Sequence, residues 1–294
     1  MPNLAATGET AMRSRASEGI YRNALRRFLR HRLAIAGGTF LLLVILAAVF
    51  APLIAPHDPE EVFWDAIRSP PSSDFWLGTD GIGRDILSRL IFGARVSLEI
   101  VFGSIVISLF IGSAMGLISG YVGGWLDNLT MRVVDGLFAF PTLILALGII
   151  AVLGPNLVNA TLAIGITNIP DFARLVRGQT LLMREQDFVQ AARALGAGNL
   201  RIMARHLWPS VVGNVIVYAS LRTSGALLTE SSLAFLGLGA APPTPTWGQM
   251  LANSLSYINY WWMGVFPGLA IFLAILAFNF VGDGIRDALD ARIR

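Results

Sequence analysis

The stretch that decides the fold runs from Asp135 to Asp171 and reads DGLFAFPTLILALGIIAVLGPNLVNATLAIGITNIPD. Between the two aspartates lie 35 residues without a charge. A helix needs about 20 apolar residues to cross the hydrocarbon core of a bilayer, so this stretch is long enough for two crossings. Gly154-Pro155-Asn156 sits near its middle and is typical of a turn. We therefore expect membrane helices at about 132–153 and 157–177, with both aspartates near the same membrane face.

Apolar runs on either side of this stretch predict four more membrane helices. They lie at about 33–55, 98–120, 210–236 and 263–282. In the whole chain of 294 residues, 54% are hydrophobic and 14% are charged. That charged share is roughly half of what a soluble domain carries. We therefore expect an all-α polytopic membrane protein with six transmembrane helices.

The placement of arginine predicts the orientation of the chain, because cytoplasmic loops carry an excess of basic residues. All 22 basic residues are arginines. With the N-terminus inside, the inner segments hold 17 of them, the outer segments hold four, and Arg222 lies within a membrane helix. Both termini are therefore expected in the cytoplasm. The expected parts are a tail at 1–32, a first membrane helix at 33–55, an extracytoplasmic loop at 56–97, a core at 98–284 and a tail at 285–294.

The composition excludes several kinds of chemistry. The chain has no cysteine, which excludes disulfides and thiolate sites, and no lysine to complete a phosphate-binding loop. Its three histidines fall in separate segments without metal-ligand spacing. We expect no catalytic residue, no metal site and no cofactor bound by this chain. A polytopic protein of this kind is a conduit, a receptor or one subunit of a larger machine.

A polar segment between the fourth and fifth membrane helices, residues 185–209, reads EQDFVQAARALGAGNLRIMARHLWP. Its first half has helical periodicity, with Phe188, Ala192 and Leu195 on one face. Gly196-Ala197-Gly198 predicts a break, and Asn199 is a candidate N-cap for a second short helix that ends before Pro209. The segment is either a docking knob for another protein or an amphipathic connector on the membrane surface.

The pattern of Gln190-Ala191-Ala192, then Gly196 and finally Pro209, resembles the EAA loop of bacterial ABC-importer permeases. In that family the loop is a coupling helix that seats in a groove of the ATPase subunit. This chain departs from the family pattern in carrying Gln190 where the family often has Glu, and His206 and Trp208 where aliphatic residues are common. The resemblance implies these ATPase-coupling residues: Gln190, Ala191, Ala192, Gly196, Gly198 and Pro209.

Two further segments, Leu77–Arg89 and Phe235–Trp247, are similar to dipeptide/oligopeptide permeases of the peptide/nickel import family, and in particular to their C-type permease. The resemblance implies a bacterial inner-membrane location, with the last five helices forming the permease core. It also implies a paralogous second permease, one or two ATPase subunits that use ATP and Mg²⁺, and an extracytoplasmic substrate-binding protein. The expected function is import of di- or oligopeptides by alternating access. The alternatives are import of glutathione, a nickel chelate or another small solute, and, more distantly, a stand-alone channel or secondary transporter.

Polar residues within the 210–236 helix are candidates for the translocation pathway, because charge inside a membrane is costly and normally faces a partner or water. They either line a path for a zwitterionic peptide or anchor the helix to the second permease. The candidate pathway residues are Ser220, Arg222, Thr223, Thr229 and Glu230.

Prolines and glycines near the helix ends carry the remaining expectations. Pro141 is expected to kink the 132–153 helix, either as fixed shape or as a hinge. Gly282-Asp283-Gly284 is expected to cap the last helix. The loop after residue 236 is rich in proline and aromatic residues, and its candidate contacts with the binding protein are Pro242, Pro243, Pro245 and Trp247.

Overall fold

A computed structural model describes residues 28–29 and 31–289, and over that range it confirms the expected all-α fold. The tail at 1–27 and the last residues, 290–294, lie outside the described residues. The elements are α2 (Arg32–Val49), α3 (Ala51–Ile54), η1 (Trp64–Ala66), α4 (Ile86–Val122), α5 (Gly124–Phe138), α6 (Thr142–Leu153), α7 (Leu157–Arg184), α8 (Asp187–Ala194), α9 (Asn199–Ile202), η2 (Met203–Leu207), α10 (Trp208–Phe235), α11 (Trp247–Ser254), η3 (Leu255–Tyr257) and α12 (Trp262–Leu289).

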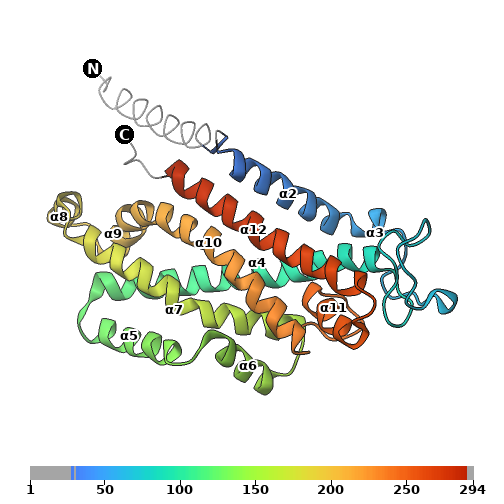
Figure 1. The fold of residues 1–294 in the computed structure, drawn as a ribbon. Helices are drawn as coiled ribbons and strands as arrows, with labels where there is room; N and C mark the ends of the chain where they lie inside the picture. Colours follow the sequence, from blue (N-terminus) through green and yellow to red (C-terminus); the bar gives the residue numbers. More distant parts are fainter. Residues whose placement is uncertain (1–27, 30, 290–294) are drawn as a thin grey trace.

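The long helices lie lengthwise beside one another, α5 and α6 lie along the side of α7, and the remaining short elements lie at the two ends (Figure 1). The most extensive packing is between α4 and α7, followed by α12 against α10 and α2. The short helices α8 and α9 project at one end, whereas α11 and the loop at 55–85 lie at the other (Figure 1). The two ends of the molecule therefore carry separate surfaces, joined by the bundle.

Among the described residues, four helices are long and apolar enough to cross a membrane: Arg32–Val49, Ile86–Val122, Asn199–Phe235 and Trp262–Leu289. A fifth crossing results if α5 and α6 together count as one. The helix α7 has 28 residues but is too polar to meet the same criterion. Four spans, or five with that pair, are thus supported by length and composition, and the expected span at 157–177 coincides with α7.

The helix expected at 132–153 is two helices rather than one kinked helix. The helix α5 ends at Phe138, α6 begins at Thr142, and their axes are bent by 92°. Pro141 is the N-cap of α6, with an extended ψ of 133°. Proline has no N–H to donate to the preceding turn and disfavours helix before it, so the chain breaks here instead of bending.

Three glycines spaced by four residues explain the close packing of α4 on α7. A Cβ on Gly112 would lie 2.6 Å from the Ile169 carbonyl oxygen, and one on Gly120 would lie 3.0 Å from the Arg177 carbonyl oxygen. A Cβ on Gly116, between them, would collide with α7 backbone. Small residues at this spacing let two membrane helices approach until their backbones touch.

The prediction that Gly282-Asp283-Gly284 caps the last helix is wrong, because α12 continues to Leu289. The two glycines serve helix packing. A Cβ on Gly282 would lie 2.7 Å from the Leu221 side chain on α10, and one on Gly284 would collide with Ala34 on α2. These glycines therefore hold α12 against both of its neighbours.

Candidate coupling surface and polar helix face

The segment at 187–207 projects from the end of the bundle (Figure 1), and we call it the knob. Its outer surface is mixed: Leu195 is 89% exposed, Leu200 76% and Phe188 43%, beside exposed charged residues such as Arg193 and Arg201. Exposed apolar side chains that cluster in this way form a surface that another protein can cover. The helix-break expected at Gly196 is present between α8 and α9.

A small core ties the knob to the ends of α4 and α7. Val189 of α8 and Ile202 of α9 are fully buried and pack with Tyr121 of α4. The Tyr121 hydroxyl donates to Asn199 Oδ1 at 3.0 Å, and Arg184 donates from Nη1 to the Gly120 carbonyl at 2.9 Å. The knob is therefore packed and hydrogen-bonded directly against the ends of α4 and α7.

Two details of the knob differ from expectation. Gly198, not Asn199, is the N-cap of α9, and the Asn199 side chain binds Tyr121 instead. The second short helix is also not separate, since η2 is a π-helical turn that joins α9 to α10 before Pro209. A π turn accommodates an extra residue without ending the helix. The second half of the knob, α9 and η2, is thus continuous with α10.

The coupling residues implied by the resemblance are mostly on the surface. One of them, Ala192, is buried on the inner face of α8. The exposed ones are Gln190, Ala191, Gly196, Gly198 and Pro209. Gly196 has a φ of +79°, which favours glycine, and no atom lies within 4 Å of where its Cβ would be. This corner is open to an approaching partner.

Arg222 forms an ion pair with Asp171 across α10 and α7, and the Tyr218 hydroxyl donates to the same carboxylate at 3.3 Å. Arg222 is about one-third exposed and Asp171 is 15% exposed. Arg222 lies within a helix that is apolar enough to cross a membrane, and the Asp171 carboxylate lowers the cost of placing that charge there. The sequence marked Arg222 as unusual, but its partner lies 51 residues earlier and was not foreseen.

Two of the other candidate pathway residues, Thr223 and Glu230, are buried. Glu230 is 1% exposed and accepts a hydrogen bond from Ser97 Oγ of α4 at 3.3 Å. Thr223 is also buried, and its hydroxyl donates to the Ala219 carbonyl of its own helix. The structure therefore places Glu230 and Thr223 between helices. Only Ser220, Arg222 and Thr229 keep part of their surface exposed.

Replacing Asp171 with asparagine is expected to destabilise the chain by about 2 kcal/mol, because Arg222 loses its counter-charge. The loss is smaller than for a fully buried pair, since water reaches part of Arg222. The double variant Asp171→Asn/Arg222→Gln should recover much of that loss, as no unpaired charge remains. Thermal unfolding of the natural chain, the single variant and the double variant in detergent tests this. Equal stability of the single and double variants would contradict the pairing.

The four residues expected to contact a binding protein divide into two groups. Pro242 and Pro243 are exposed. Pro245 is buried, and Trp247 is 3% exposed with its indole N–H donating to the Leu90 carbonyl at 3.0 Å. Pro245 and Trp247 are thus not available to a partner. They hold the loop at the start of α11 against α4.

Comparison with known families settles what kind of protein carries this architecture. A family described as "Binding-protein-dependent transport system inner membrane component" matches residues 112–294, which is more than half of the chain. The chain belongs to this family. A second match, "N-terminal TM domain of oligopeptide transport permease C", covers residues 20–71 of the permease. The permease is therefore a subunit of an ABC importer of the peptide/nickel family, as its motifs predict.

Two curated relatives share nearly the full length of the permease. It is 44% identical over 276 residues to the glutathione transport system permease protein GsiD of Pectobacterium atrosepticum, covering 93% of this chain and 92% of the relative. It is 45% identical over 271 residues to the protein of the same name from Escherichia coli O1:K1, covering 92% and 89%. Both relatives are named as transport subunits, and the permease is likewise a transport subunit and not an enzyme.

A solved structure shares the fold. The inward-facing MetNI methionine ABC transporter matches with a TM-score of 0.57 at 20% identity, covering 68% of the permease and 96% of that chain. The likeness supports the importer fold alone. Together, the family and the apolar helices make the permease a multi-pass inner-membrane protein, whose membership implies ATPase, second-permease and substrate-binding partners. It is also consistent with a chain that carries no cofactor.

Proposed function

We propose that this chain is the permease of an ATP-driven importer whose substrate is glutathione or a closely similar short peptide. The observation that supports this substrate is the 44–45% identity, over about nine-tenths of each chain, to permeases named for glutathione transport. From the sequence alone, glutathione is one of the alternatives to di- and oligopeptides as the substrate. The relatives favour it over both a dipeptide and a nickel chelate.

The coupling surface of this proposal is the knob, with both termini in the cytoplasm. An ATPase subunit would cover Phe188, Leu195 and Leu200, which are exposed in the isolated chain. The core around Tyr121 and the continuity of the knob with α10 support a lever that carries ATPase closure into the bundle. ATP and Mg²⁺ would be bound by the ATPase, and alternating access would follow from two arrangements of the paired permeases.

The test is uptake into vesicles that contain the permease, its second permease and its ATPases, with the binding protein added outside. Labelled glutathione should accumulate only with ATP inside and binding protein outside, and an excess of an ordinary dipeptide should not compete. An assembly whose ATPase cannot hydrolyse ATP is the control and should show no uptake.

Two results would contradict this proposal in different ways. Uptake that persists without ATP would exclude an ABC importer mechanism and favour a channel or secondary transporter. Uptake that a dipeptide or a nickel chelate suppresses more strongly than glutathione does would keep the importer and reject the substrate.

A further inference from the structure

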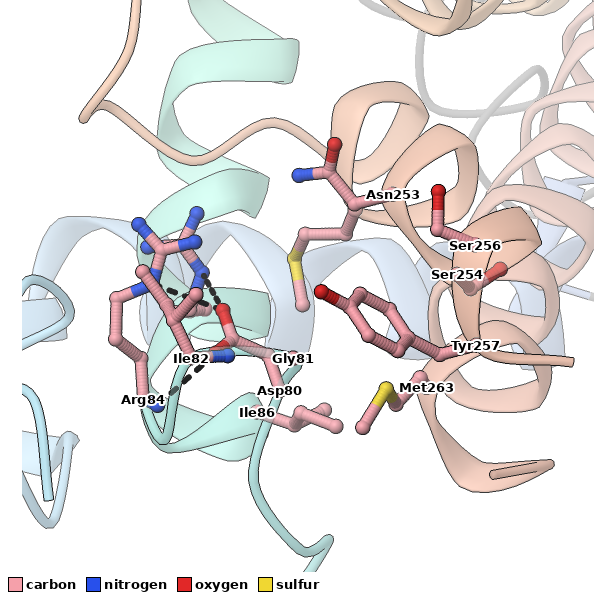
Figure 2. A pocket seen from close by; sticks show the side chains of 12 residues that line it. Asp80, Gly81, Ile82, Arg84, Ile86, Asn253, Ser254, Ser256, Tyr257 and Met263 are labelled. Atoms are coloured by element: carbon pink, nitrogen blue, oxygen red, sulfur yellow. Dashed lines mark hydrogen bonds and ion pairs between the residues drawn. The ribbon is translucent and has the colours of Figure 1, made fainter. Parts of the chain in front are cut away.

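A pocket of about 280 Å³ lies at the end of the molecule opposite the knob, and neither coupling nor the membrane helices require it. Two segments far apart in the sequence form it (Figure 2): the turn at 80–89 that leads into α4, and the segment at 250–263 between α11 and α12. Its volume is at the small end of pockets that hold small molecules. It can hold one or two residues of a peptide but not a long one.

One wall of the pocket carries more positive than negative charge. Asp80 accepts a hydrogen bond from Arg84 Nε at 2.8 Å, and Arg89 Nε lies 3.6 Å from the same carboxylate oxygen. Arg89 is 2% exposed and also donates to the Pro59 carbonyl at 2.8 Å. Two guanidinium groups thus share one carboxylate, so these three lining side chains carry a net charge of +1, while the Glu60 carboxylate also interacts with Arg89 from outside the lining. Among the described residues, none accepts a hydrogen bond from the Arg84 Nη atoms.

The opposite wall offers neutral polar groups. Figure 2 shows Tyr257 directing its hydroxyl across the pocket toward Asp80 and Arg84, while the Asn253 amide lies farther off at the edge of the pocket. Gly81 makes this placement possible, because a Cβ there would collide with the Tyr257 ring. The floor is apolar and consists of Ile86, Met250 and Met263.

We propose that this pocket is an outer subsite that binds the carboxylate end of a short peptide substrate. Arginine recognises a carboxylate through paired N–H donors, and the Arg84 Nη groups have donors to spare. The Tyr257 hydroxyl and Asn253 amide suit a peptide bond, and the apolar floor suits the carbon stem between polar groups. The identity of the peptide rests on the proposed function, whereas the carboxylate chemistry rests on the pocket.

The experiment measures peptide binding to the complete importer in nanodiscs, with no binding protein and no nucleotide. Glutathione is titrated by calorimetry against the natural assembly and the variants Arg84→Gln and Asn253→Ala. Loss of one hydrogen bond to a charged group should raise the Kd for glutathione about tenfold in Arg84→Gln. Asn253→Ala leaves the arginine–aspartate network intact and should raise the Kd for glutathione several-fold. Glutathione diethyl ester, which lacks free carboxylates, should bind weakly to every form.

The matched control is Arg95→Gln, which removes an exposed arginine of α4 outside the pocket and should leave the Kd unchanged. The subsite is refuted if both pocket variants bind glutathione like the natural assembly, or if that assembly binds none without its binding protein. Vesicle uptake would still support the proposed function in either case. The subsite is equally refuted if the variants weaken docking of the ligand-free binding protein but leave peptide affinity unchanged. The pocket would then hold an acidic side chain of that protein.

Discussion

Replacing Leu195 with aspartate is expected to abolish ATP-driven uptake while the chain still inserts and folds. Leu195 is 89% exposed, so a charge there costs the isolated chain little. If an ATPase groove covers this side chain, the same charge is desolvated without a partner, which costs binding more than about 2 kcal/mol. Uptake should therefore fall by more than about tenfold. Copurification of the ATPase with the tagged permease should fall in parallel.

The control for this variant is Leu195→Met, which keeps an apolar side chain of similar size and should retain both uptake and copurification. A second comparison is Ile258→Asp. Ile258 is 81% exposed and lies beyond α11, away from the knob, so this change should leave ATPase binding intact. ATPase recovery at the natural level with Leu195→Asp would show that the knob is not the docking surface.

The variant Gly116→Val is expected to have the largest effect on the fold. A side chain at this position would meet the Ala173 carbonyl and the Val176 Cβ of α7 where α4 and α7 pack most closely. Neither backbone can move without disturbing the flanking contacts at Gly112 and Gly120. Overpacking a close backbone contact should cost about 3 kcal/mol. The measurement is the midpoint of thermal unfolding in detergent, together with the yield of assembled importer.

Gly178→Ala is the matched control on α7. Gly178 is exposed, and no atom lies within 4 Å of where its Cβ would be. Alanine is favoured over glycine inside a helix by up to about 1 kcal/mol, so this variant should be as stable as the natural chain or slightly more stable. An unchanged midpoint for Gly116→Val would mean that the glycine contacts are not what holds α4 and α7 together.

Much of the helical architecture could be predicted because membrane helices appear in a sequence as long runs of apolar residues. The run at 210–236 corresponds to α10 within two residues at each end, and Gly154-Pro155-Asn156 is the turn between α6 and α7. Glycine spacing at 112, 116 and 120 was also visible and could have located the α4–α7 contact. The break at Pro141 was marked by the proline, but its size depends on what α5 and α6 pack against.

Contacts between helices were beyond prediction from one sequence. Glu230 was recognisable as an unusual charge, but its neighbour Ser97 lies 133 residues earlier. Polarity alone does not distinguish a residue that faces water from one that faces another helix. The same ambiguity affected Trp247, whose indole is equally suited to a partner surface and to the Leu90 carbonyl that it binds. Such assignments need the three-dimensional arrangement of the helices.

The polarity of α7 has a consequence for how the chain is made. Three of its four charges pair with other helices: Arg174 with Asp135 and Arg177 with Asp127, both of α5, and Asp171 with Arg222 of α10. The fourth, Arg184, pairs with the adjacent Glu185. During synthesis α5 emerges first, but Arg222 emerges 51 residues after Asp171. Released alone from the translocon, α7 would expose an uncompensated carboxylate to lipid. We therefore expect stable insertion of α7 to follow the synthesis of α10, so that the two helices enter the bilayer together.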